Sequence, residues 1–138
     1  MVDIRRLLAI EGRINRTEYI AYTFLYSLSF IIAGIAIGYA PEPAATIGSV
    51  AAIVAYAALI GALTVRRVHD MDERGWFAII LLIPLVNLYL FFSPGSPPSN
   101  RFGNPPASSS VQMKVLAVSG LVWPFLALAM ILLLEDTL

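Results

Sequence analysis

Residues 43–65 read PAATIGSVAAIVAYAALIGALTV, and residues 66–70, which follow directly, read RRVHD. The first stretch has no charged residue and is long enough to cross a bilayer, because about 20 apolar residues in a helix span about 30 Å of hydrocarbon. The second stretch places two arginines, a histidine and an aspartate at the end of that span. Together they predict a transmembrane helix that ends in a polar cluster at the membrane surface.

Three more apolar stretches lie on either side of this one. Tyr19–Pro41 and Val115–Leu134 are uncharged and long enough to span. The stretch Trp76–Phe92 is shorter and carries Pro84, which removes a helical hydrogen bond and predicts a kink or a turn. The sequence therefore predicts an all-α integral membrane protein, a polytopic helical bundle of four apolar segments in one domain over residues 1–138. The third segment either spans the membrane or re-enters it.

The composition excludes several other classes of protein. Hydrophobic residues make up 59% of the chain and charged residues 13%, against about 25% charged in an average soluble domain. Nine cations balance nine anions, so there is no excess charge to neutralise the phosphates of a nucleic acid. Without cysteine and with one histidine, the chain offers no multi-histidine or thiolate metal site. We therefore predict no metal, no cofactor and no nucleic-acid partner.

The positions of the cations predict the orientation, because short loops rich in Lys and Arg stay on the cytoplasmic side. With four spans, seven of the nine cations and both termini are cytoplasmic. This is the simpler prediction, since a turn inside the membrane must be sheltered from lipid. If the third segment turns back at residues 84–87, all nine cations are cytoplasmic and the C-terminus is outside, which fits the charge rule better. The N-terminus is cytoplasmic in both topologies.

Short sequence patterns predict further details of the structure near the N-terminus. Residues 2–10 alternate apolar and charged residues in a way that predicts a short interfacial helix. Asn15 and Glu18 have the spacing of a capping box at the start of the first span. Gly34 and Gly38 form a small-residue pair that favours close helix packing, either against the alanine-rich second span or between two copies of the chain.

Three polar motifs punctuate the spans, and together they resemble a known family. They are GRINRTEY at residues 12–19, RRVHD at 66–70 followed by RGWF at 74–77, and NRFG at 100–103 followed by PP at 105–106. This ordered set is similar to the small bacterial inner-membrane proteins called domain of unknown function 805. The resemblance covers about residues 10–106 and leaves the apolar segment at 115–134 outside it. It implies residence in the bacterial inner (plasma) membrane, and it implies no reaction; the apolar segments themselves predict a multi-pass protein.

The arginines of these motifs gather at the ends of spans that share the cytoplasmic face. Arginine suits phosphate because its planar guanidinium donates two hydrogen bonds together. The sequence therefore predicts either a general topology and headgroup anchor or a specific site for an anion or a lipid headgroup, and Arg101 joins the set only in the hairpin topology. Its cations are Arg13, Arg16, Arg66, Arg67, Arg74 and Arg101, and its polar partners are Glu18, His69, Asp70 and Asn100.

Each polar partner also has an ordinary structural reading. Glu18 fits a helix cap, and His69 with Asp70 fits a local hydrogen-bonded pair. On one continued helix Arg66 would face Asp70 and His69 would face Glu73, four residues on. Asn100 fits a turn with Gly103.

The leading functional hypothesis is a non-enzymatic membrane module. It would bind anionic lipid headgroups, or a partner protein, through the cytoplasmic arginines, since the motifs contain no nucleophile constellation. The alternative is an enzyme acting on a lipid or lipid-linked phosphate, in which His69, Asp70 or Glu18 would handle protons. A second alternative is a small oligomeric transporter or channel. A protein partner or second copy would dock through Gly34 and Gly38.

Overall fold

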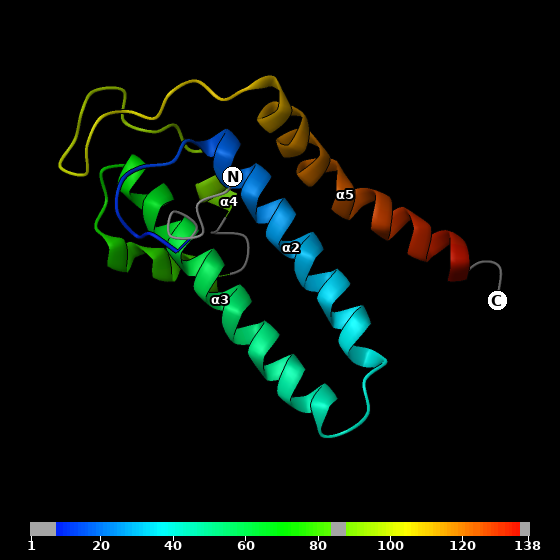
Figure 1. Cartoon of the computed structure of the whole chain (residues 1–138). Coiled ribbons are helices and arrows are strands. Elements are labelled where there is room, and N and C mark those ends of the chain that lie inside the picture. The colour runs from blue at the N-terminus through cyan, green and yellow to red at the C-terminus, as the bar shows by residue number, and fades with distance from the viewer. Residues whose placement is uncertain (1–7, 84–87, 136–138) are drawn as a thin grey trace.

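The computed structural model describes residues 8–83 and 88–135, and these residues are mostly helical (Figure 1). No β-strand is formed within these two ranges. The all-helical fold predicted from the sequence is thus confirmed. The elements are α2 (Arg16–Gly38), α3 (Ala44–Asp70), the 3-10 helix η1 (Gly75–Leu82), α4 (Leu88–Phe92) and α5 (Val111–Glu135).

Helix α2 begins where the sequence predicts it. The side chain of Asn15, in extended backbone conformation, accepts a hydrogen bond of 2.9 Å from the Glu18 amide. This satisfies one of the amides that the first helical turn leaves unpaired. The Asn15 half of the predicted capping box is confirmed. Of the predicted interfacial helix, residues 2–7 lie outside the described residues, and residues 8–10 are not helical.

Helices α2 and α3 form an antiparallel hairpin joined by a short turn at residues 39–43. The two helices contact each other along the length of this hairpin. The Ile14 amide bonds the Arg66 carbonyl at 3.3 Å near one end, and Gly48 faces Ile37 near the other. Between them, the Tyr19 hydroxyl lies 3.2 Å from that of Thr64. The start of α2 and the end of α3 therefore lie together, and we call this the polar end of the hairpin.

Both helices are long and apolar enough to cross a membrane. They contain 23 and 27 residues, or about 34 Å and 40 Å at 1.5 Å per residue. Only 11% and 17% of their most apolar windows are buried within the protein, so neither resembles the core helix of a soluble domain. A third, shorter apolar stretch occupies Val111–Ala127 of α5. Four full spans are not confirmed.

The third apolar segment leaves the polar end of the hairpin and returns to it. Element η1 starts five residues after α3 ends. The carbonyls of Leu90 within α4 and of Ser93 just after it accept hydrogen bonds from the Arg67 side chain, and the Ser96 hydroxyl donates to the Asp70 carbonyl. The simpler expectation, in which this segment carries the chain across to the opposite end, does not match this path. The described ends of this path agree with the hairpin alternative. The turn that this alternative predicts falls at residues 84–87, which lie outside the described residues.

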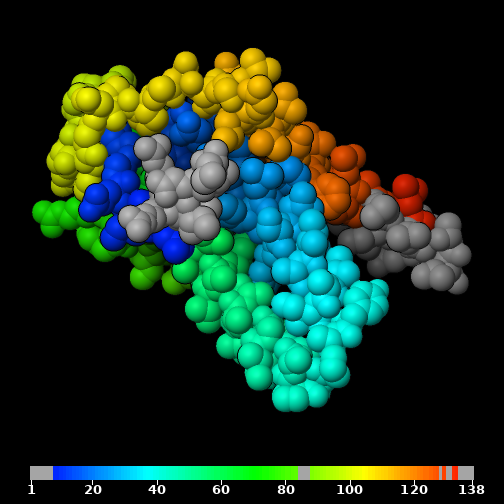
Figure 2. Space-filling view, in the orientation of Figure 1, coloured from blue at the N-terminus to red at the C-terminus, as the bar shows by residue number. Residues whose placement is uncertain are grey.

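Helix α5 runs alongside α2 in the same direction. Ala117 packs with Ile20 and Ala21, and a Cβ on Gly120 would lie 2.7 Å from the Cβ of Phe24. Because Gly120 has no side chain, the two helices approach closely here. Beyond this contact α5 diverges from α2, so that the α2–α3 hairpin and the end of α5 form two separate arms (Figure 2).

The expected packing of Gly34 and Gly38 against the second span is wrong. A Cβ added at either position would meet no atom within 4 Å. The close approach between α2 and α3 occurs instead at Gly48, whose Cβ would lie 3.3 Å from Ile37. Packing of Gly34 and Gly38 between two copies of the chain stays a prediction.

Candidate functional site

Two arginines and one aspartate form a buried ionic cluster at the polar end of the hairpin. Asp70 closes α3, and its Oδ2 accepts a hydrogen bond of 2.7 Å from Nη1 of Arg67, one turn earlier. Its Oδ1 accepts from Nε and Nη2 of Arg13 at 3.1 and 3.0 Å. The side chains of Arg13, Arg67 and Asp70 are 1%, 0% and 4% exposed. We call these three residues the Arg–Asp–Arg cluster.

Backbone carbonyls of the returning segment accept further hydrogen bonds from both arginines. Arg13 donates to Ser96 at 2.5 Å, Pro98 at 2.9 Å and Gly103 at 3.2 Å. Arg67 donates to Leu90 at 2.8 Å and to Ser93. The cluster carries one more positive than negative charge, and the carbonyl dipoles offset the excess. Each guanidinium nitrogen of the two arginines therefore donates at least one hydrogen bond inside the protein, where unpaired charge is costly.

The loop after α4 lies directly on Asp70, which the sequence did not indicate. The Ser96 amide and hydroxyl both donate to the Asp70 carbonyl, at 2.8 and 3.0 Å. A Cβ on Gly95 would lie 2.7 Å from Cγ of Asp70 and even closer to Oδ2, so only glycine lets the loop approach the carboxylate. A glycine in a Pro- and Ser-rich loop ordinarily indicates flexibility. The contact between Gly95 and Asp70 could therefore not be predicted from the composition of the loop.

His69 points away from Asp70 and joins a different set of contacts. Its Nδ1 lies 3.3 Å from the Gly12 carbonyl, and its ring stacks on Phe102 with centroids 3.7 Å apart. The predicted hydrogen-bonded pair of His69 and Asp70 is wrong, because both Asp70 oxygens face arginines. The predicted Arg66–Asp70 pair also fails, because that carboxylate pairs with Arg13 and Arg67. The predicted His69–Glu73 pair fails because α3 ends at Asp70, so Glu73 is not on the same helix.

The third motif reaches the same end of the molecule and forms a tight turn. Asn100 and Gly103 exchange two backbone hydrogen bonds of 3.0 Å, as the turn reading predicted. The Asn100 side chain also donates to the His69 carbonyl at 2.9 Å. Arg101 pairs with Asp72 at 3.3 Å and lies over the Phe102 ring. All three motifs therefore meet at the polar end.

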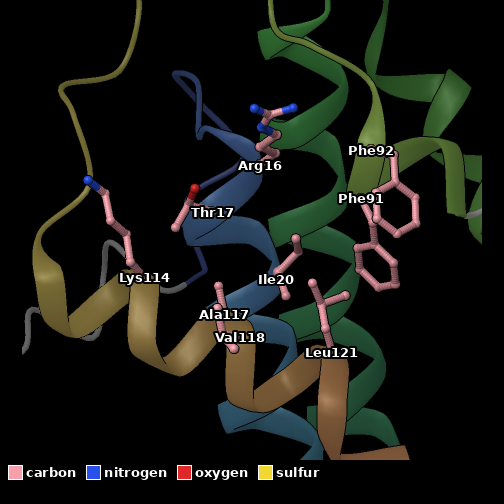
Figure 3. Close-up of a pocket in the computed structure, with 9 residues that line it drawn as sticks. All are labelled: Arg16, Thr17, Ile20, Phe91, Phe92, Lys114, Ala117, Val118 and Leu121. Atoms are coloured by element: carbon pink, nitrogen blue, oxygen red, sulfur yellow. The ribbon is translucent and has the colours of Figure 1, made fainter.

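The remaining predicted residues lie around this cluster. Arg16 and Arg74 are exposed, whereas Arg66 and Glu18 are partly buried. Lys114, the one lysine of the chain, was not among the predicted site residues. It is exposed in the first turn of α5 and lines a groove together with Arg16 (Figure 3). Because Lys114 follows a long loop, the sequence could not predict that it lies near Arg16.

Comparison with known proteins agrees with the resemblance of the three motifs. The family model described as protein of unknown function (DUF805) matches residues 7–104, which is most of the chain. The chain is 28% identical to inner membrane protein YhaI of Escherichia coli, strains K12 and O157:H7, over 118 residues, or 78% of this chain and 93% of YhaI. It is 37% identical to inner membrane protein YhaH of Escherichia coli K12 over 49 residues, or 33% of this chain and 40% of YhaH. No solved structure matches. The chain belongs to the DUF805 family and is a membrane protein.

Proposed function

We propose that this member of the DUF805 family is a bacterial inner-membrane module that binds anionic lipid headgroups through exposed cations at one end of its helices. One observation carries the proposal. Every Lys and Arg side chain within residues 8–83 and 88–135 belongs to the polar end or to the start of α5, whereas the opposite turn at residues 39–43 has none. By the positive-inside rule this end is cytoplasmic, where anionic headgroups attract basic residues.

The exposed cations carry this proposal, and the buried ones do not. The donors of Arg13 and Arg67 are engaged with Asp70 and with backbone carbonyls. An outside phosphate would have to break those bonds before it could bind. The cations that lie on the surface, where a headgroup can reach them, are Arg16, Arg74, Arg101 and Lys114.

The same contacts weigh against the enzymatic alternative. His69 is stacked on Phe102 and faces Gly12, and both carboxylate oxygens of Asp70 accept from arginine. Neither group is placed to exchange a proton with a substrate, because each already has fixed partners. For His69 and Asp70, the non-enzymatic reading is therefore the better supported one.

Labelling of single cysteines tests the proposed topology, and the cysteine-free chain makes it direct. We expect an impermeant maleimide to label Glu42→Cys from outside intact cells. Glu73→Cys and Ser99→Cys should react only after permeabilisation, because the third segment returns to the end where it started. All three positions are exposed in the structure. Labelling of Ser99→Cys together with Glu42→Cys would instead show that the third segment spans.

Lipid retention tests the function itself. The protein would be reconstituted in nanodiscs with equal amounts of phosphatidylglycerol and phosphatidylcholine, and the lipids that stay bound would be counted by native mass spectrometry. We expect wild type to retain mainly phosphatidylglycerol. The Arg16/Arg74/Arg101/Lys114→Gln variant should lose this preference, since each cation near the surface contributes about 1 kcal/mol.

A control variant at exposed acidic residues separates headgroup binding from a general effect of surface mutation. Glu11 and Glu73 are exposed acids, and Glu73 lies at the same end. The Glu11→Gln/Glu73→Gln variant should keep or slightly raise the retention of phosphatidylglycerol. An equal preference for phosphatidylglycerol in wild type and in the four-cation variant would contradict the proposal.

A further inference from the structure

A groove between α2, α4 and α5 combines an apolar interior with two cations at one end. Its volume is about 270 Å³. Ile20 of α2, Phe91 of α4 and Leu121 of α5 face one another across it (Figure 3). Arg16 and Lys114 lie toward the end where α2 and α5 begin, and the apolar side chains lie further along the helices. We call this the α2/α4/α5 groove.

The two ends of the groove suit the two parts of a phospholipid. Because α2 and α5 run side by side in the same direction, the apolar walls follow the direction of an acyl chain in the bilayer. Arg16 begins the first span, so it lies at the depth of the headgroup phosphates. A guanidinium donates paired hydrogen bonds to phosphate, and an ammonium adds a mobile point charge.

We infer that the α2/α4/α5 groove binds one anionic phospholipid. Arg16 and Lys114 hold its phosphate, and one acyl chain lies along Ile20, Phe91 and Leu121. The inference rests on the proposed function and makes it specific, because it assigns lipid binding to two of the four exposed cations. Charge complementarity argues for this occupant over a second copy of the chain, whose apolar surface would leave both cations unneutralised.

Paired substitutions test the headgroup end of the groove. The probe is phosphatidylglycerol titrated into the full chain in a non-ionic detergent, with bound lipid counted by native mass spectrometry. Arg16→Gln/Lys114→Gln should weaken the apparent affinity about 10- to 30-fold, from two lost cations. Arg74→Gln/Arg101→Gln removes the same number of exposed cations outside the groove and should weaken the affinity by a clearly smaller factor, because these two cations do not contact the lipid held in the groove.

A bulky side chain tests the acyl end. Leu121→Trp would fill the groove, whereas Val122→Trp places the same bulk on the next residue of α5, which is 44% exposed and does not line the groove. We expect Leu121→Trp to weaken phosphatidylglycerol binding about tenfold and Val122→Trp to leave it near wild type. Water-soluble glycerol phosphate should not compete at equal concentration, because it lacks the acyl chain.

The outcomes separate this inference from the function on which it rests. Equal losses in the two cation pairs would overturn the groove while leaving general headgroup binding in place. Unchanged binding in Leu121→Trp, or full competition by glycerol phosphate, would also overturn the groove, since the acyl chain would then play no part. Absence of any preference for phosphatidylglycerol in wild type would remove the proposed function and the groove together.

Discussion

Replacement of Asp70 by asparagine is expected to lower the free energy of unfolding by about 3–5 kcal/mol, the usual effect of removing one partner from a buried ion pair. Asparagine has nearly the same size, so the packing around position 70 is kept. What changes is the charge. Arg13 and Arg67, with side chains 1% and 0% exposed, would stay buried without a counter-ion. The measurement is unfolding of the purified protein by sodium dodecyl sulfate, followed by circular dichroism.

Asp72 provides a matched control two residues away. It also pairs with an arginine, Arg101, at 3.3 Å, but the two side chains are 51% and 47% exposed. Exposed pairs contribute about 0–1 kcal/mol because water already solvates both charges. Asp72→Asn should therefore unfold close to wild type. If Asp70→Asn and Asp72→Asn proved equally mild, the Arg–Asp–Arg cluster would not hold the three motifs together.

The spanning helices could be predicted from the sequence, but the path of the third segment could not. A gap between charges reports how long an apolar helix can be, which is why α2 and α3 were predicted well. It does not indicate whether that apolar segment crosses the membrane or turns back. The segment after α3 comes back to Arg67, whose side chain donates to the carbonyls of Leu90 and Ser93, and hydropathy carries no information about these bonds.

The sequence predicted which residues gather at the candidate site, but it did not predict how they pair. The arginines of the three motifs were recognised, and the motifs do meet. The pairing of Arg13 with Asp70, however, joins residues 57 positions apart, and spacing along the chain cannot indicate it. The local partners that spacing did suggest for Asp70, namely Arg66 and His69, were wrong. Both carboxylate oxygens of Asp70 accept from Arg13 and Arg67, and the His69 ring stacks on Phe102.

Substitution of Gly95 by alanine is expected to destabilise the protein by about 1–3 kcal/mol, the usual range for forcing extra atoms into a packed site. The added Cβ would lie 2.7 Å from Cγ of Asp70. The backbone of Gly95 is not in the left-handed region, so alanine is not strained by its own conformation. Either the loop must lift, which breaks the bonds from Ser96 to Asp70, or the carboxylate must rotate away from its arginines.

Two further variants assign the effect of Gly95→Ala to the Asp70 carboxylate. Gly61→Ala adds the same methyl group to α3, where a Cβ meets no atom within 4 Å, and should stabilise that helix by about 0.5–1 kcal/mol. In an Asp70→Ala background the clash is absent, so adding Gly95→Ala should change the unfolding free energy by less than about 0.5 kcal/mol. The same loss in both backgrounds would mean that Gly95 acts through some other contact. Full stability of Gly95→Ala alone would mean that the loop has room to move, and that the close approach of the loop to Asp70 is dispensable for the hairpin path of the third segment.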